Sequence, residues 1–235
     1  MTQTRAALIV AHGQPSDPDP AEADLARLTA AVAAQMPGWR LGAATLAAPG
    51  ALERALTGLD SPLVLPFFMA DGWFTRTALP DRLAAAGAPG LTRLPAFGTM
   101  KAVEELAIRA ARKAVLGREW TLAETTLVLA AHGSGRSRAP AEAAERIADA
   151  VRAALDFREV RLGFIEEEPA LQSVAAGVGD QAICLPLFVA RWGHVLTDIP
   201  AALTGAGFPG PCLAPLGARP EVPAIIAAAL LAAAG

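Results

Sequence analysis

The chain has 235 residues, of which 53% are hydrophobic and 18% are charged, and its formal net charge is −3. This composition supplies ample apolar material for buried cores, argues against disorder and gives no basic field for nucleic acid. Because no apolar stretch reaches the roughly 18 residues that a membrane-spanning helix needs, and the N-terminus shows no signal-peptide pattern, we expect a soluble cytoplasmic protein.

Short apolar runs alternate with helical patterns along the first half of the chain. The aliphatic run Ala6–Ala11 predicts a buried strand that ends at His12-Gly13. We then expect, in chain order, a loop at Gln14–Pro20, a helix at Ala21–Gln35, a strand at Leu41–Leu46, a helix at Pro49–Leu59, a strand at Pro62–Phe68, a helix at Ala78–Ala86 and a long helix at Lys101–Leu116. We expect that last helix to close the first lobe.

The second half repeats this order of elements. We expect a strand at Thr126–Ala131, a helix at Ala139–Leu155, a strand at Val160–Phe164, a helix at Pro169–Val178, a strand at Ala182–Phe188, a helix at Asp198–Ala206 and a closing helix at Glu221–Ala234. Strands that alternate with helices predict an α/β fold with parallel sheets covered on both faces. Ligands bind such sheets at the carboxyl ends of the strands.

The two halves are related by a constant offset of 120 positions. The phrase Ala11-His12-Gly13 recurs as Ala131-His132-Gly133. Other matches at this offset are Pro20-Ala21-Glu22-Ala23 with Pro140-Ala141-Glu142-Ala143, Leu65-Pro66 with Leu185-Pro186, Thr77 with Thr197, and Pro80 with Pro200. A constant offset over such a span indicates one duplicated domain. We therefore predict two similar lobes, at residues 1–118 and 119–235.

Candidate site residues follow the strands of the second half. His132 ends one strand, and His194 lies just beyond another. Because the ends of neighbouring parallel strands meet, two imidazoles at one mouth would suit a divalent ion such as Fe²⁺, Co²⁺, Ni²⁺ or Zn²⁺. Of the three acidic residues that follow Phe164-Ile165, we expect Glu166 to point into the site and Glu168 to favour the positive end of a helix dipole.

Comparison of the two halves indicates a single site. At the 120-residue offset Glu166 corresponds to Leu46, and His194 corresponds to Phe74. Only the first histidine of the His-Glu-His set has a counterpart. We therefore expect the site to lie in the C-terminal lobe, and the N-terminal lobe to be degenerate.

The chain resembles the sirohydrochlorin chelatases, the ATP-independent class of tetrapyrrole chelatases, in their two-lobed form. The motifs that carry the resemblance are Ala131-His132-Gly133-Ser134, Phe164-Ile165-Glu166 with Glu168-Pro169, and Leu185-Pro186-Leu187-Phe188 leading to Gly193-His194 and Asp198-Ile199-Pro200. It departs from the family in the first lobe, where Gly72-Trp73-Phe74 occupies the glycine-x-histidine position.

The resemblance implies an enzyme of cobalamin or sirohaem biosynthesis. It implies that His132, His194 and Glu166 bind the metal and serve its insertion, and that a cleft between the lobes holds the macrocycle. No organic cofactor is implied, and the divalent metal, Co²⁺ or Fe²⁺, is a substrate. Insertion must remove two pyrrole N–H protons, which neutral imidazoles and a nearby carboxylate can accept near neutral pH.

Several side chains near the histidines are candidates for binding a polyanionic tetrapyrrole. Arginine forks suit peripheral carboxylates, although a solvated basic loop is an equal alternative. The candidates are Ser134, Arg136 and Arg138 after His132, and Arg191 and Trp192 before His194. Trp73 and Phe74 are also possible contacts for the macrocycle face, but as readily core aromatics.

Other functions stay open at this point. One is a ferrochelatase acting on protoporphyrin or coproporphyrin, whose apolar substrate would suit Phe67-Phe68-Met69 and Trp73-Phe74. Another is a metal or tetrapyrrole carrier without catalysis, against which Glu166 argues because binding alone needs no proton acceptor. We expect no nucleic-acid or membrane partner, and a monomer or homodimer. The two cysteines, Cys184 and Cys212, are too few for a disulfide framework, and we expect both to be buried apolar residues.

Overall fold

The computed structural model describes residues 5–235. The chain forms two compact units, one containing Met1–Thr99 and Pro220–Gly235, and the other Met100–Arg219. Each unit contains one parallel three-stranded sheet with helices around it.

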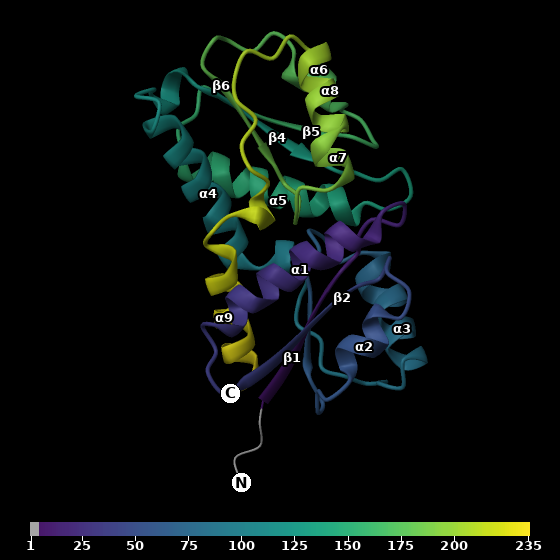
Figure 1. The fold of residues 1–235 in the computed structure, drawn as a ribbon. Helices are drawn as coiled ribbons and strands as arrows, with labels where there is room; N and C mark the ends of the chain where they lie inside the picture. The colour runs from purple at the N-terminus through teal and green to yellow at the C-terminus, as the bar shows by residue number, and fades with distance from the viewer. Residues whose placement is uncertain (1–4) are drawn as a thin grey trace. The chain divides into compact units, whose positions relative to one another are not determined.

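The first unit is built on strand β1, which lies between the other two strands of its sheet in the order β2-β1-β3. Both neighbours run parallel to β1. The elements of this unit are β1 (Arg5–Ala11), α1 (Pro18–Ala33), β2 (Trp39–Thr45), α2 (Ala51–Leu56), β3 (Leu63–Pro66), the π-helix η1 (Phe74–Ala78), α3 (Leu79–Ala85), the 3-10 helix η2 (Phe97–Thr99) and α9 (Val222–Ala233). The helices α1, α2, α3 and α9 and the strands β1 and β2 are labelled in Figure 1, and the other elements can be followed by their colour.

The second unit repeats this arrangement around β4, with strand order β5-β4-β6 and parallel pairing. Its elements are α4 (Lys101–Leu116), the 3-10 helix η3 (Leu122–Glu124), β4 (Thr126–Ala131), α5 (Ala139–Ala154), β5 (Glu159–Phe164), α6 (Leu171–Ala175), β6 (Ala182–Pro186), α7 (Gly193–Leu196), α8 (Asp198–Gly205) and the 3-10 helix η4 (Leu216–Ala218).

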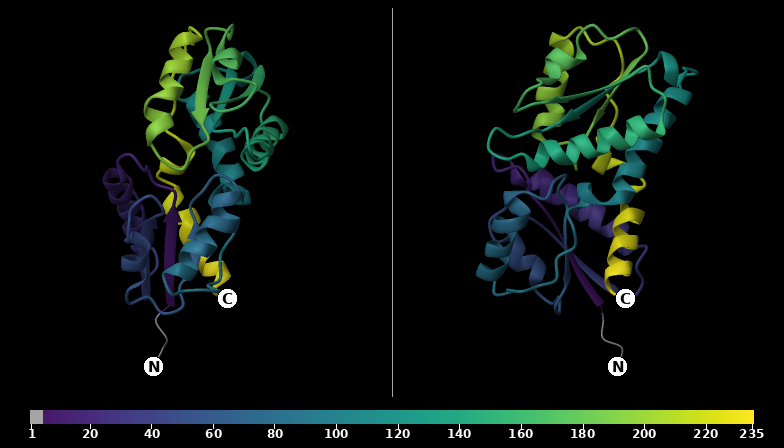
Figure 2. Two further views of the ribbon diagram at one scale, coloured as in Figure 1. Left: turned by 90° about the vertical axis from the view of Figure 1, so that its right-hand side faces the viewer. Right: turned by 180° about the vertical axis from the view of Figure 1, so that it is seen from behind.

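Helices cover both faces of each sheet, which is why the central strands are apolar along almost their whole length. In the first unit Leu8 and Val10 of β1 pack with Leu52 of α2 and Leu83 of α3, and α1 covers the other face. In the second, Val128 and Ala130 of β4 pack against α6 and α8, while α5 contacts β4 from the opposite side. Figure 2 shows these layers from two further sides. The predicted fold class is confirmed.

The two long helices expected to close the lobes belong to the opposite units. Helix α4 packs against α5 and contacts β6, so it lies in the second unit, whereas α9 packs beside α1 in the first (Figure 1). The boundaries drawn at 1–118 and 119–235 therefore differ from those of the structure. The sequence predicts that each helix has an apolar face, but that periodicity carries no information on which sheet the face covers.

Most predicted elements occur within a few residues of their expected bounds, but three details differ. The helix expected at Ala78–Ala86 starts earlier, as the π-helix η1 that runs into α3. The helix expected at Pro169–Val178 is only the five residues of α6. Cys184 is buried as predicted, but Cys212 is exposed, so that prediction was wrong for Cys212.

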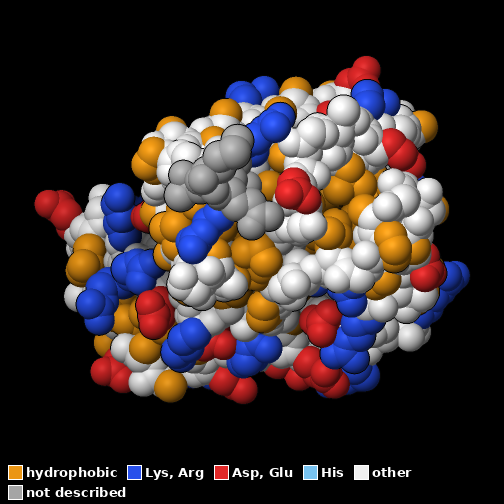
Figure 3. Space-filling view, turned by 90° about the horizontal axis from the view of Figure 1, so that it is seen from below, with side chains coloured by type: hydrophobic (Ala, Val, Ile, Leu, Met, Phe, Trp, Pro, Cys, Tyr) orange, Lys and Arg blue, Asp and Glu red, His pale blue; other side chains and the backbone are white. Residues whose placement is uncertain are grey.

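Two surface properties bear on the expected partners. Among the helices that the structure describes, none has both the length and the apolar character needed to cross a bilayer. The face in Figure 3, viewed from the side of the N-terminus, carries acidic and basic side chains interspersed with apolar ones. That face therefore presents no continuous basic field.

Candidate metal centre in the second unit

Three loops at the carboxyl ends of the second sheet bring His132, Glu166 and His194 together. His132 follows β4 directly, Glu166 lies two residues after β5, and His194 lies on the short helix α7 beyond β6. Each residue offers one ligand atom, and these atoms all lie within 4.8 Å of one another. No other set of three such ligand residues occurs in the part of the chain that the structure describes.

Backbone pairing continues past the strands and fixes the first two residues relative to each other. The N–H groups of Ile165 and Glu166 donate to the carbonyl of His132, at 3.2 and 2.9 Å. On the other side of β4, the N–H of Leu187 donates to the carbonyl of Ala130 at 2.7 Å. These backbone hydrogen bonds therefore fix the positions of His132 and Glu166 at the end of the sheet.

The two histidine rings face each other edge to face. Their centroids are 4.6 Å apart, with an angle of 89° between the planes. His132 Nδ1 lies 2.8 Å from the carbonyl oxygen of Gly133, and His194 Nδ1 lies 2.6 Å from Oδ2 of Asp198. Because a carbonyl and a carboxylate only accept hydrogen bonds, a neutral ring makes this contact as a hydrogen bond only when its proton is on Nδ1. The Nε2 lone pairs of both rings are then available for a metal ion or a proton.

The three consecutive glutamates after β5 make different contacts. The carboxylate of Glu166 lies in the cluster of possible ligands with His132 and His194. The carboxylate of Glu167 accepts a hydrogen bond from the N–H of Ser134 at 2.6 Å, and that of Glu168 accepts one from the N–H of Ala170, just before α6, at 2.8 Å. Glu167 therefore holds the loop after β4, and Glu168 lies at the helix start where we expected it.

Gly133 allows this close contact between the two loops. Its φ is +73°, and a Cβ at this position would lie 2.6 Å from Cγ of Glu167 and 3.0 Å from Cβ of Phe164. A larger residue would both strain the backbone and displace Glu167. The backbone conformation and the contact with Glu167 therefore both require glycine after His132.

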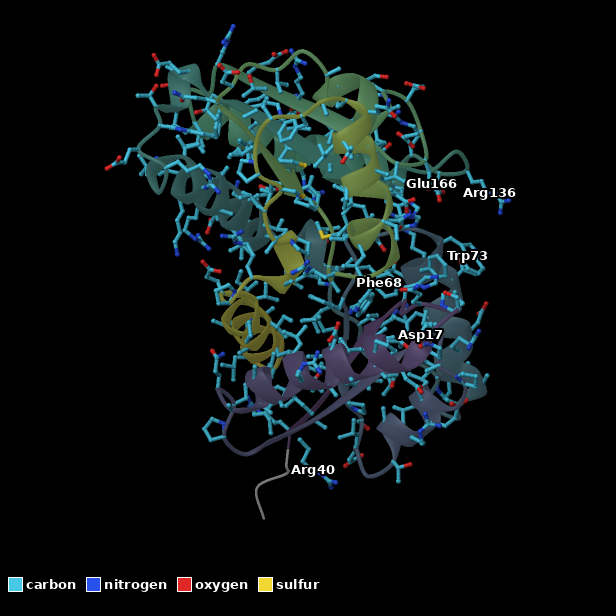
Figure 4. All side chains as sticks on the ribbon, turned by 45° about the horizontal axis from the view of Figure 1, so that its top comes forward. Asp17, Arg40, Phe68, Trp73, Arg136 and Glu166 are labelled. Atoms are coloured by element: carbon cyan, nitrogen blue, oxygen red, sulfur yellow. The ribbon has the colours of Figure 1, made fainter. Side chains whose placement is uncertain are left out.

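The residues predicted to bind substrate carboxylates lie in different settings. Arg136 is exposed, and Figure 4 shows it on the same side of the second unit as Glu166. Ser134 is partly buried and accepts a hydrogen bond from the N–H of Arg136 at 3.2 Å. Arg138, in contrast, pairs with Glu145 of α5 at 3.3 Å. Arg136 is therefore better placed than Arg138 to contact a ligand.

Arg191 and Trp192 precede α7 on the loop that carries His194. Arg191 is exposed and Trp192 is partly buried. Cys184 of β6 forms an isolated parallel β-bridge with Cys212, and both thiols are free. The hydrogen bond between these thiols lowers the pKa of Cys212, with a further contribution from the positive charge of Arg191, and it raises the pKa of Cys184, as does burial. The positive charge of Arg191 therefore reaches Cys212.

The corresponding place in the first unit is aromatic. There the ring of His12 packs edge to face against the ring of Phe74, with 4.2 Å between the ring centroids. The centroid of the Phe74 ring lies 5.1 Å from that of Trp73 and 6.2 Å from that of Phe68. Leu46, at the position that matches Glu166, is buried. Figure 4 shows Phe68 and Trp73 toward one end of this unit and Arg40, near the start of β2, at the other.

Two contacts were not foreseen from the sequence. The hydrogen bond between Asp198 and His194 was visible only as a four-residue spacing, which places two side chains on one helical face. The bond from Ser134 to Glu167 joins residues 33 positions apart, and nothing in the local sequence signals it.

Comparison with known proteins identifies the family. The family model described as CbiX matches residues 126–233. A solved structure described as CbiX, the terminal enzyme for biosynthesis of sirohaem in denitrifying bacteria, is 48% identical, with a TM-score of 0.90, 97% of this chain covered and 99% of that chain. The chain belongs to the CbiX family. The resemblance to the sirohydrochlorin chelatases, and the expectation that the chain is an enzyme, are confirmed.

More distant relatives agree with this result. A probable sirohydrochlorin cobaltochelatase of Halobacterium salinarum is 26% identical over 165 residues, which is 60% of this chain. This chain spans 56% of that relative's length. SirB from Bacillus subtilis, solved with Fe³⁺, is 14% identical with a TM-score of 0.77, covering 97% of this chain and 95% of SirB. At that identity the likeness supports the fold alone.

Proposed function

We propose that this protein inserts a divalent metal ion into sirohydrochlorin, in the cytoplasm and without an organic cofactor. The observation that carries the proposal is the pair of histidines whose Nδ1 atoms lie against hydrogen-bond acceptors, in one cluster of possible ligands with the Glu166 carboxylate. Membership of the CbiX family supports the same substrate.

The three side chains supply the chemistry that insertion requires. Two pyrrole N–H bonds must break, the tetrapyrrole nitrogens must bond to the ion, and two protons must leave the macrocycle. His132 and His194 replace water around the ion through Nε2 and then accept a proton once the ion has moved to the macrocycle. Glu166 is exposed, so it can take a proton and release it to solvent.

Fe²⁺ is the first candidate for the metal, and Co²⁺ the second. The relative that matches over nearly the whole chain is described as an enzyme of sirohaem biosynthesis, and sirohaem contains iron. The Halobacterium relative, which matches over a smaller part, is described as a cobaltochelatase. Imidazole and carboxylate ligands bind both ions, so the side chains alone do not choose between them.

The test is to mix the purified protein with sirohydrochlorin and either Fe²⁺ or Co²⁺ under anaerobic conditions, and to follow the absorption change on insertion. The rate should exceed that of the uncatalysed reaction for at least one metal, and it should be lost in His194→Ala. A rate equal to the uncatalysed one with both metals would refute the proposal. Binding of sirohydrochlorin without insertion would support the carrier function.

One observation favours a second candidate, a ferrochelatase acting on a porphyrin. Trp73 is 62% exposed and Phe74 is 38% exposed, so the first unit presents an aromatic surface at the matching end of its sheet. Phe67, in contrast, is buried and is not part of that surface. Efficient insertion into protoporphyrin or coproporphyrin, with none into sirohydrochlorin, would establish this alternative.

A further inference from the structure

We infer that Asp198 is a positioning residue for metal capture, because its carboxylate holds the proton of His194 on Nδ1 and so keeps Nε2 available for the ion. The inference rests on the proposed function, since it concerns the same metal centre. It assigns a role to a side chain outside the ligand set.

The geometry of α7 and α8 fixes this contact. Asp198 is the first residue of α8 and lies four residues after His194, one helical turn away. Between them the N–H and hydroxyl of Thr197 both donate to the carbonyl of Gly193 at 3.0 Å, which closes the turn. Val195 and Ile199 anchor the segment in the core. The backbone beneath both side chains is therefore held in place.

The contact determines which ring nitrogen meets the ion. A free histidine side chain in water carries its proton mainly on Nε2, the nitrogen that a ligand role here requires to be bare. The Asp198 carboxylate, 2.6 Å from Nδ1, accepts a hydrogen bond only from the tautomer with the proton on Nδ1. Such carboxylate–histidine pairs orient metal ligands and raise their basicity.

The duplicated half provides an internal comparison. At the 120-residue offset His194 becomes Phe74, and Asp198 becomes Ala78. The neighbours Thr77 and Pro80 are the same residues as Thr197 and Pro200. The carboxylate is therefore absent where the imidazole is absent, although the surrounding segment is retained. A carboxylate that served only the helix start would have no reason to follow the histidine.

The first test is the tautomer of His194. The chain has three histidines, and in ¹⁵N-labelled protein long-range ¹H–¹⁵N correlation resolves their ring nitrogens. The measurement is made about two pH units above the value of about 6.5 at which a free imidazole titrates, so that neutral rings are observed. We expect His194 to carry its proton on Nδ1 in the wild type, but to shift toward Nε2 in Asp198→Ala and in Asp198→Leu, which keeps the size of the side chain but offers no acceptor. His132, bonded to the carbonyl of Gly133, is the internal reference and should not change.

The second test is affinity for Co²⁺ alone, measured by absorption. Asp198→Ala and Asp198→Leu should each weaken binding about ten- to a hundred-fold. The matched control is Asp81→Ala, which removes an exposed acid from the first turn of α3, the equivalent helix of the first unit, and should bind like the wild type. Thermal unfolding of all variants separates loss of the fold from loss of the contact.

Two results would overturn the inference: an unchanged His194 tautomer in Asp198→Ala or Asp198→Leu, or a changed tautomer with unchanged Co²⁺ affinity. If Asp198→Ala does not fold, the Leu variant still decides, because it fills a similar volume without a hydrogen-bond acceptor. Neither measurement involves a tetrapyrrole. A wild-type protein that shows the expected tautomer and Co²⁺ affinity but inserts no metal would refute the proposed function and leave the role of Asp198 intact.

Discussion

The glutamates 166, 167 and 168 have the same side chain but different surroundings, and those surroundings assign their roles. Glu167 and Glu168 accept hydrogen bonds from backbone N–H groups, whereas Glu166 lies in the group of candidate ligands. A base must reach a proton in the site, and within this trio only Glu166 is so placed. We therefore propose Glu166 as the proton acceptor and assign structural contacts to Glu167 and Glu168.

We predict that Glu166→Gln lowers the rate of insertion about a hundred-fold or more, because the amide keeps the shape of the side chain but cannot accept the proton. Metal affinity should fall much less, since two imidazoles remain. Both quantities are measured on the same variant, by absorption change with tetrapyrrole and by titration with the metal alone. Glu168→Gln is the control, because its amide oxygen still accepts from Ala170. Equal losses of rate and affinity would make Glu166 a plain ligand.

The arginines near the site differ in whether an acidic partner already holds them. We predict that Arg136→Gln or Arg191→Gln raises the Michaelis constant for octacarboxylate sirohydrochlorin about ten-fold or more, since a charge-assisted contact contributes about 1.5–3 kcal/mol. Arg138→Gln, which breaks a pair with Glu145, is the control and should change it little. The effects should be smaller with a dicarboxylate porphyrin. Equal effects of all three variants would indicate a general field and no specific contact.

At the scale of elements, a charged cluster joins α4 to α5 in the second unit. Glu104 is buried and accepts hydrogen bonds from Lys101 at 2.9 Å and from Arg146 of α5 at 2.8 Å. Burial raises the pKa of Glu104, but the two hydrogen bonds outweigh burial, and the net pKa lies below its ordinary value. The ionised carboxylate therefore stabilises the folded protein.

We predict that Glu104→Gln lowers the free energy of unfolding by about 1–2 kcal/mol at neutral pH, a range reduced because the side chains of Lys101 and Arg146 are exposed to solvent. Because the folded pKa is depressed, the contribution is present above the unfolded value of about 4.3 and is lost as the pH falls through the folded pKa. Urea unfolding of wild type and variant across this range measures the difference. A difference that grows on acidification would contradict the assignment.

Helix α4 belongs to the second unit and α9 to the first, opposite to the arrangement expected from the sequence, and this difference gives a prediction. Ile226 of α9 is fully buried, and truncation of such a residue to alanine costs about 2–5 kcal/mol. Ile226→Ala should reduce the hydrogen-exchange protection of β1 more than that of β4, and Val103→Ala in α4 should do the reverse. The opposite pattern would restore the boundaries expected from the sequence.

The origin of these helix assignments explains what the sequence can and cannot predict. Aliphatic runs such as Thr126–Ala131 predict strands because burial on both faces demands apolar residues at every position. The site residues follow from strand ends, where parallel topology brings loops together. The apolar face of α9 fits either sheet, and the surroundings of Cys212 depend on packing between distant segments. Those features depend on three-dimensional contacts that no local pattern records.

At the scale of the whole molecule, duplication has produced two units with one complete ligand set among the described residues. Both units retain the strand-end histidine, and in both its Nδ1 lies against the carbonyl of the next glycine, at 3.0 Å for His12 and 2.8 Å for His132. The difference lies in what surrounds each ring. His132 faces His194, whereas His12 faces Phe74, which offers no lone pair.

We therefore predict that the protein binds one metal ion per chain. A lone imidazole holds a divalent ion weakly, so His12→Ala should leave both the stoichiometry and the insertion rate near those of the wild type. His132→Ala removes one of three ligands and should lower Co²⁺ affinity by more than about a hundred-fold, beyond the usual effect of losing an outer-shell partner. Calorimetric titration with Co²⁺ gives the stoichiometry and the affinity, and the absorption change on insertion gives the rate. Thermal unfolding checks that each variant is folded. Two ions per chain, or equal damage from His12→Ala and His132→Ala at saturating metal, would mean that the first unit has kept a site of its own.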